Sequence, residues 1–252
     1  RMDPTLVKAM AEVEMETPEL KAEVLLKYVI SKQPVLVLST PLDGKKEDLR
    51  RKVIMLFKQY RLFLQSDSTL KFVWCDTEYF ARPAGTAQQI QGMNNTIYEL
   101  ALAMGDVVTI SGPCKTLYDE KQGGGLSKAQ FAELKVELQS VGAGATDNET
   151  FFAHWGACEG REFEEFGVEK QYIIDMLRIF WLLFGFKGNG SKPDNSDIMF
   201  SCSMDVLSRL FGIVHSHTAL SDCSSQHHVT SALLRALYNY YVVDMGVDFD
   251  NL

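Results

Sequence analysis

Long hydrophobic runs are missing from this sequence of 252 residues: the longest, from Ile179 to Phe186, has eight residues. A helix that crosses a bilayer needs roughly 20 apolar residues. The opening residues, Arg1-Met2-Asp3-Pro4, also lack the apolar segment of a secretory signal. We therefore expect a protein with no membrane partner.

Cysteine is scarce as well. Five cysteines, an odd number spread along the chain, argue against a disulfide framework and for a reducing compartment, so we expect a cytoplasmic protein. The nucleophile and zinc-hydrolase patterns G-x-S-x-G and H-E-x-x-H are absent from the sequence. An enzyme with a Cys or His centre is accordingly only the third hypothesis for function.

A cluster of metal-ligand residue types does occur near the end of the chain. Zinc sites show paired spacing such as C-x₂-C with H-x₃₋₅-H, which this cluster does not have. We therefore interpret the cluster as a polar connection between helices, and we expect no metal and no cofactor. Its members are His215, His217, Cys223, His227 and His228.

The composition and the helix-capping signals of the sequence predict a compact, mainly α-helical protein. Apolar residues make up 46% and charged residues 23% of the chain, a globular composition. Pro4 and Pro18 each follow an N-cap residue, and Ser127 with Gln130 forms a capping box. Residues 70–76 are the one good internal strand candidate, while residues 35–38 form either a short strand or an extended connector. The expected helices include 47–65, 86–104, 127–141, 149–165, 168–185, 203–219 and 226–243.

A small, polar stretch at 142–148 is the best candidate for a hinge. It would divide the chain into an N-terminal helical lobe, 1–141, and a C-terminal helical lobe, 149–252, with extended terminal arms. A single domain is the alternative. The nearly all-apolar segment 168–185 is expected to be the central helix, with Trp181 in the core.

The segment 45–82 is a basic island in an acidic protein: it carries nine basic and five acidic side chains, whereas the whole chain has a net charge of −8. In the helix expected at 47–65, apolar residues recur at spacings of three and four and predict a buried face. Its members are Leu49, Val53, Leu56, Tyr60 and Phe63. Four cations follow one flank of the same helix, namely Arg50, Arg51, Lys58 and Arg61.

Aromatic residues alternate with cations directly after this helix. Lys71 and Arg82 flank Trp74 and Tyr79, the mixture that neutralises phosphates and stacks bases in single-stranded nucleic acid sites. Two other interpretations stay open: the aromatic residues belong to the core, and the cations face acidic side chains of the same fold.

A mainly helical chain of this length with a basic island, a hinge and terminal arms resembles the nucleocapsid and filamentous coat proteins of RNA viruses. The resemblance implies sequence-independent binding of single-stranded RNA, no catalysis, and a place in the host cytoplasm or the virion. It also implies homo-oligomers formed by exchanged arms, with Val247, Phe249 and Leu252 of the apolar-acidic tail in the contact. A helical protein–protein interaction module is the alternative function.

Overall fold

The computed structural model describes residues 4–13, 16–32, 37–79, 97–106, 115–119, 127–139, 149–156, 159–184 and 202–252. The predicted hinge at 142–148 lies outside the described residues, as does Arg82. The backbone of Tyr79 is described, but its side chain is not.

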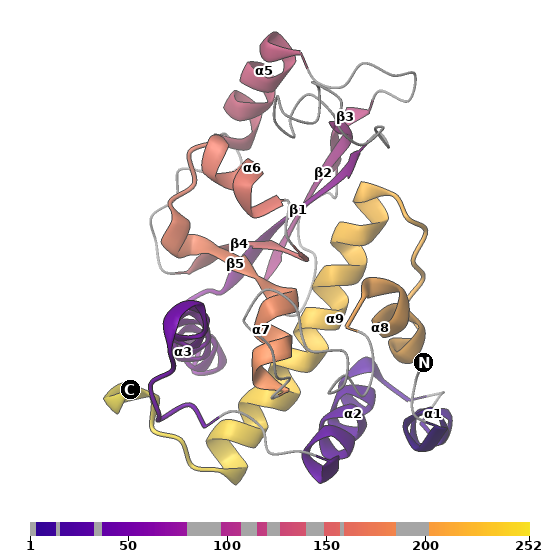
Figure 1. Cartoon of the computed structure of the whole chain (residues 1–252), viewed down its shortest axis with the longest axis vertical. Coiled ribbons are helices and arrows are strands. Elements are labelled where there is room, and N and C mark those ends of the chain that lie inside the picture. Colours follow the sequence, from indigo (N-terminus) through magenta and orange to yellow (C-terminus); the bar gives the residue numbers. More distant parts are fainter. Residues whose placement is uncertain are drawn as a thin grey trace. The chain divides into compact units, whose positions relative to one another are not determined.

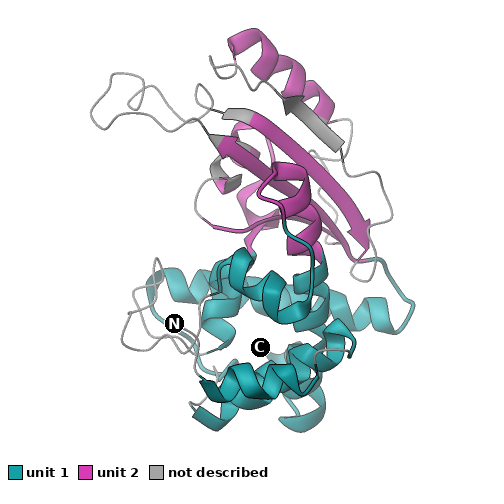
Figure 2. Cartoon of the chain, turned by 90° about the vertical axis from the view of Figure 1, so that its right-hand side faces the viewer, with its two compact units in different colours: residues 1–69, 176–215, 228–252 teal, residues 70–175, 216–227 magenta. Residues whose placement is uncertain are grey.

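The chain forms two compact units that interleave along the sequence (Figure 2). Unit 1 comprises residues 1–69, 176–215 and 228–252, and unit 2 comprises residues 70–175 and 216–227. The sequence predicted two consecutive lobes, 1–141 and 149–252. The units differ from these lobes because strands from both sides of the predicted boundary pair in one sheet.

Unit 1 is helical. The prolines at Pro4 and Pro18 begin the first two helices, as predicted, since proline fits the first helical position. No helix among the described residues combines the length and apolar character needed to cross a membrane. The elements of unit 1 are α1 (Pro4–Ala11), α2 (Pro18–Lys32), α3 (Gly44–Leu64), α7 (Met176–Leu183), α8 (Met204–Phe211), the end of α9 (Ala219–Asn239), the π-helical η4 (Tyr240–Asp244) and η5 (Phe249–Asn251).

Helix α3 confirms the predicted helix and most of its buried face. Val53, Leu56 and Tyr60 are buried, while Leu49 and Phe63 are only partly buried. Phe57, which the predicted face did not include, is fully buried and contacts the rings of Tyr238, Tyr241 and Phe249.

Two expectations about unit 1 were wrong. Trp181 is partly exposed rather than central; the buried residues of α7 are instead Met176, Ile179, Phe180, Leu182 and Leu183. Helix α8 ends at Phe211, short of the predicted end at 219, because the next residue, Gly212, adopts a φ of 69° that leaves the helix.

Unit 2 contains a five-stranded mixed sheet (Figure 1). Its strands are β1 (Lys71–Tyr79), β2 (Ile97–Asp106), β3 (Lys115–Asp119), β4 (Thr150–His154) and β5 (Ile173–Asp175). They lie in the order β3-β2-β1-β4-β5. Strand β2 is antiparallel to β1 and β3, while β4 is parallel to β1 and β5 is parallel to β4.

The sequence predicted β1 but assigned residues of three other strands to helices. The described part of the expected helix 86–104 is strand β2, and parts of the helices expected at 149–165 and 168–185 are β4 and β5. Ala and Leu dominate β2 and favour helices in isolation, but here both faces of the strand are buried in the sheet. Tertiary pairing therefore overrides local propensity.

The helices of unit 2 cover opposite faces of the sheet. One face packs against α5 (Lys128–Leu138), which begins with the predicted capping box, and against α6 (Glu159–Glu165). The core on that face consists chiefly of Val73, Cys75, Leu100, Leu102, Leu134, Phe152, Phe163 and Phe166. The opposite face contacts the first turns of α9, and these contacts position the candidate site (Figure 1).

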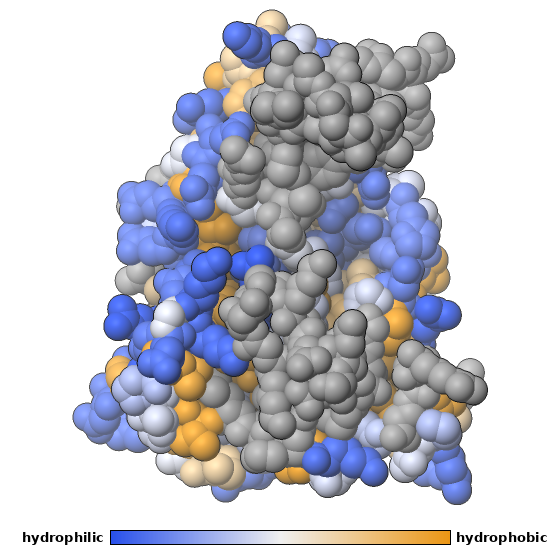
Figure 3. Space-filling model, in the orientation of Figure 1, coloured by the Kyte–Doolittle hydropathy of each residue, from blue (hydrophilic) through white to orange (hydrophobic). Residues whose placement is uncertain are grey.

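Exposed large hydrophobic side chains come from many different elements rather than from one. Figure 3 shows hydrophilic residues over much of the described surface on the visible face, with smaller hydrophobic areas between them. The most exposed are Val214, Val243, Val136, Val37 and Met245. Single exposed hydrophobic residues of this kind are normal at protein surfaces.

Candidate functional site

Strand β1 presents two carboxylates on one face. Side chains alternate along a strand, so Asp76 and Glu78 share the face that carries Phe72 and Trp74. Asp76 is only 8% exposed. A buried carboxylate is costly unless a partner compensates it, so this part of β1 requires specific neighbours.

The neighbours come from the first turns of α9. Thr218 begins this helix: its hydroxyl accepts a hydrogen bond from the Ser221 amide at 3.2 Å. Three side chains of α9 then bond to the sheet. Cys223 Sγ donates to the Ala101 carbonyl at 3.5 Å, Gln226 Nε2 donates to Asp76 Oδ1 at 3.0 Å, and His227 Nδ1 accepts from Trp74 Nε1 at 3.0 Å.

The spacing of side chains along α9 matches the spacing of side chains along β1 at this contact. Residues four apart on a helix are separated by about 6 Å along its axis, and residues two apart on a strand by about 6.7 Å. Asp222 and Gln226 on α9 can therefore meet Glu78 and Asp76 on β1 in pairs. Sequence positions about 150 residues apart form one polar surface.

Three carboxylates converge there. Oxygen atoms of Asp76, Glu78 and Asp222 all lie within 4.8 Å of one another. Glu99 on β2 pairs in register with Glu78 and is 6% exposed, so it adds a fourth acidic side chain. We call Asp76, Glu78, Glu99 and Asp222 the carboxylate cluster.

The electrostatics of the cluster favour a cation. Burial raises the pKa of Glu78, the negative charges of Asp222 and Glu99 raise it further, and His217 partly opposes them. The carboxylate charges thus repel one another. A divalent cation between them would reverse this repulsion, because carboxylate oxygens are the ligands that Mg²⁺ and Mn²⁺ prefer.

An independent observation also fits a cation with its water shell. Gln226 is 2% exposed, and its Oε1 has no hydrogen-bond partner within the described part of the chain. A buried, unsatisfied amide oxygen costs about 1–3 kcal/mol. A water bound to a cation at Asp76 would supply the missing donor.

His217 lies near the cluster, since its charge acts on the pKa of Glu78. Its backbone adopts a φ of 51°, in the left-handed region that non-glycine residues rarely occupy. Backbone strain of this kind concentrates at functional sites. The imidazole is exposed.

Sequence reasoning missed this site. It interpreted the region 215–228 as a polar connection, although Asp222 and Gln226 lie within it. The signal that could have found the site is the pair Asp76-x-Glu78, which follows the apolar run 72–75 in the same strand. Two carboxylates on the same face of a buried strand are difficult to explain by packing.

The predicted nucleic-acid residues on α3 mostly have acidic partners in unit 1. Arg50 is 7% exposed and bonds to both carboxylate oxygens of Glu47. Arg51 bonds to the same carboxylate but is exposed. Arg50 and the Leu42 amide, then Arg51, lower the pKa of Glu47 to about 2.

The other members of the set are dispersed. Arg61 makes two hydrogen bonds to the carboxylate of Asp250, at 2.6 and 3.1 Å. Arg61 and, less strongly, Lys58 lower the pKa of Asp250. Lys71 is exposed at the start of β1, whereas Trp74 is fully buried and cannot stack on a base in this structure.

The residues of the predicted histidine and cysteine cluster do not all lie together. His215 Nε2 lies 3.4 Å from Asp205 in unit 1, whereas Cys223 and His227 contact the sheet of unit 2. The residues predicted for oligomer contacts lie at the end of unit 1. Phe249 is 1% exposed against Phe57, while Val247 and Leu252 are partly exposed.

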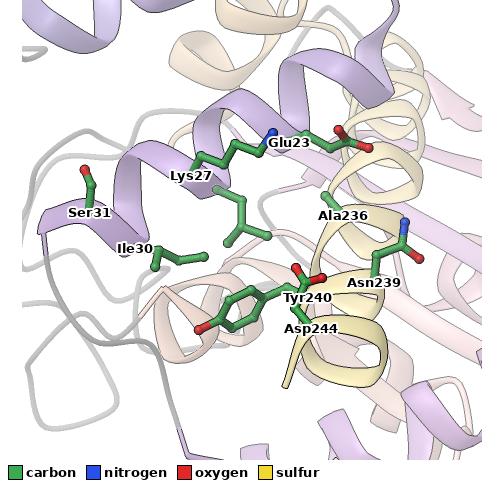
Figure 4. A pocket seen from close by; sticks show the side chains of 9 residues that line it. Glu23, Lys27, Ile30, Ser31, Ala236, Asn239, Tyr240 and Asp244 are labelled. Atoms are coloured by element: carbon green, nitrogen blue, oxygen red, sulfur yellow. The ribbon is translucent and has the colours of Figure 1, made fainter. Parts of the chain in front are cut away.

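Unit 1 contains a separate pocket of about 570 Å³, a size typical of small-molecule sites. Figure 4 shows Glu23 and Lys27 on α2, and Tyr240 and Asp244 on the π-helical η4. Leu26, Ile30 and Ala236 contribute apolar surface. Its charged groups have both signs and select no ligand class, so the carboxylate cluster is the stronger candidate.

No protein-family model matches the chain, and no curated protein sequence matches it. The function of the carboxylate cluster is therefore inferred from its own chemistry.

Proposed function

We propose that this protein is a divalent-cation-dependent nuclease that hydrolyses phosphodiester bonds in single-stranded nucleic acid. The observation that carries the proposal is the convergence of Asp76, Glu78 and Asp222, with oxygen atoms within 4.8 Å of one another. Mg²⁺ sites of this kind combine a few carboxylates with waters and the phosphate of the substrate.

The side chains have distinct roles in this proposal. Asp76, Glu78 and Asp222 would hold Mg²⁺ or Mn²⁺, which polarises a phosphoryl oxygen and activates water. His217 would accept one proton as the water oxygen bonds to phosphorus. The bond from phosphorus to the leaving sugar oxygen breaks, and that oxygen takes up a proton.

The sheet supports the proposal by placing two of the acids on its central strand. The strands lie in the order β3-β2-β1-β4-β5, with β2 antiparallel to both of its neighbours, and β1 carries Asp76 and Glu78.

Single-stranded RNA, which the sequence predicts as the partner, becomes a substrate in this proposal. Exposed Lys71 and Arg51 support a contact with phosphates. Self-assembly through the tail residues stays a second, separate proposal, which the elution volume of the purified protein tests. A protein–protein interaction module is the alternative if nuclease activity is absent.

The test is a cleavage assay with single-stranded RNA and DNA oligonucleotides that carry a label at either the 5′ or the 3′ end. We expect the wild type to cleave the oligonucleotides in the presence of Mg²⁺ or Mn²⁺, and we expect EDTA to abolish cleavage. Asp76→Asn and Asp222→Asn should each lose at least about 100-fold in rate, because each removes a cation ligand. The two end labels separate internal cutting from stepwise shortening.

The matched control is Asp67→Asn, an exposed aspartate of unit 1. It makes the same chemical change in the unit that does not carry the carboxylate cluster, and it should cut at the wild-type rate. Equal cutting by all four proteins would indicate a contaminating nuclease, and no cutting by the wild type would overturn the proposal.

A further inference from the structure

We infer that Gln226 is a positioning residue of the proposed cation site, which fixes the Asp76 carboxylate and accepts a hydrogen bond from a water on the cation. The inference rests on the proposed function and deepens it. Gln226 itself is not a cation ligand in this arrangement.

The first step is the orientation of Asp76. Gln226 Nε2 donates to Asp76 Oδ1 at 3.0 Å, and both side chains are buried, at 2% and 8% exposure. A hydrogen bond to one oxygen fixes the rotation of a carboxylate about its terminal bond. It therefore sets where Oδ2 of Asp76 points relative to Glu78 and Asp222.

The second step is the unsatisfied half of the same amide. Exchanging the oxygen and nitrogen of Gln226 would place an oxygen against the Asp76 carboxylate, so the hydrogen bond assigns Oε1 to the other side. That Oε1 is buried and has no partner among the residues described. An amide that bonds Asp76 and leaves its oxygen unpaired is suited to a ligand that brings a donor.

The third step is the position of Gln226 on its helix. Gln226 follows Asp222 by one helical turn, so a single element carries both a ligand and the residue that orients another ligand. Its neighbour His227 bonds to Trp74, two residues before Asp76 on β1. These bonds fix the register of α9 against β1.

The experiment compares the wild type with Gln226→Met, which keeps the length of the side chain and removes both hydrogen-bonding groups. Mn²⁺ binding is measured by calorimetry on the full chain, and the Mg²⁺ concentration for half-maximal cutting is measured separately. We expect both metal constants to weaken by about 10-fold or more, since removing a partner of a ligand typically costs 10- to 100-fold. The KM for the oligonucleotide should stay unchanged.

The matched control is Gln59→Met. Gln59 is also a buried glutamine, 6% exposed, but its amide bonds to Ser68 and Thr69 in unit 1. This variant should keep the wild-type metal constants whatever it does to stability. Circular dichroism confirms that each variant is folded, and Gln226→Asn provides a second loss of the Asp76 contact if Gln226→Met is not folded.

The outcomes of this experiment test the cation site and the role of Gln226 separately. A wild type that binds no Mn²⁺ removes the cation site and the inference with it. A wild type that binds Mn²⁺, together with a folded Gln226→Met or Gln226→Asn variant that binds it equally well, overturns the role of Gln226 alone. A weaker metal constant in both Gln226→Met and Gln59→Met would also overturn it, because the effect would then be general.

Discussion

Trp74 and His227 are joined by a 3.0 Å hydrogen bond from the indole Nε1 to the imidazole Nδ1, and both side chains are fully buried. The bond assigns the acceptor role to Nδ1. It links the strand that carries Asp76 to the helix that carries Gln226, and it lies next to the proposed cation site.

This pair makes a prediction about stability. Trp74→Phe should cost about 1–3 kcal/mol in the free energy of unfolding, because it leaves the buried Nδ1 of His227 without its donor. Trp74→Phe combined with His227→Phe should cost less than the sum of the two single changes. Urea titration of all four proteins gives the coupling energy, and purely additive losses would contradict the prediction.

The close approach of Gly160 to the imidazole of His154 predicts that a side chain at position 160 would clash with it. A Cβ added at Gly160 would lie 2.8 Å from His154 Nε2. Gly160→Ala should therefore destabilise the protein by about 1–3 kcal/mol. In a His154→Ala background the same change should be neutral or favourable, since alanine is the better helix former. Urea titration measures both; an equal cost in the two backgrounds would place the strain elsewhere.

The lowered pKa of Glu47 predicts that the protein loses stability in acid. Its pKa is lowered to about 2, first by the hydrogen bond from Arg50 and then by that from the Leu42 amide. A carboxylate with a depressed folded pKa stabilises the fold above its unfolded pKa of about 4.5, and this contribution disappears as pH falls toward 2. Glu47→Gln should lower the melting temperature at pH 7 and flatten its decline between pH 4.5 and 2.

Asp67→Asn is the control for that measurement, because it alters an exposed carboxylate of unit 1 that forms no ion pair with the residues the structure describes. Its melting temperature should follow the wild type across the pH range. Parallel curves for Glu47→Gln and the wild type would show that the contacts of Glu47 do not contribute to folding.

Lys71 tests the nucleic-acid contact. In an Asp76→Asn background, which prevents cutting, affinity for single-stranded RNA should fall with salt. Lys71→Ala should reduce the slope of log affinity against log salt by about 0.7, the contribution of one phosphate on a single strand. Lys32→Ala, an exposed cation outside the predicted set, is the control. Equal slopes for all three proteins would exclude a phosphate contact by Lys71.

Local signals in the sequence predicted local structure well. The prolines at Pro4 and Pro18, the Ser127 capping box and the periodic face of α3 each depend on neighbours within a few residues, and each is present. Strand β1 was also predicted. By contrast, β5 has only three residues, and β2 is rich in helix-forming Ala and Leu, so pairing alone defines these strands.

The candidate site escaped prediction because its contacts are long-range. Asp76 meets Gln226 across 150 positions, and no periodic pattern reports such a pair. The cations of α3 were predicted, and the interpretation that they face acidic side chains of the same fold is confirmed for Arg50, Arg51 and Arg61. The particular acidic partners were not predicted. Glu47 lies on the same helix as Arg50, whereas Asp250 lies 189 residues from Arg61, which only folding reveals.

The interleaved chain has a consequence for synthesis. Strand β1 leaves the ribosome long before α9, and Gln226 follows Asp76 by 150 residues. At about 5–20 residues per second, roughly 8–30 s pass before the helix that covers these buried acids exists. During that interval α9 does not yet cover the acidic face of β1. A ribosome-bound chain that ends before residue 216 lacks Asp222 and Gln226, and it should therefore not yet bind Mn²⁺.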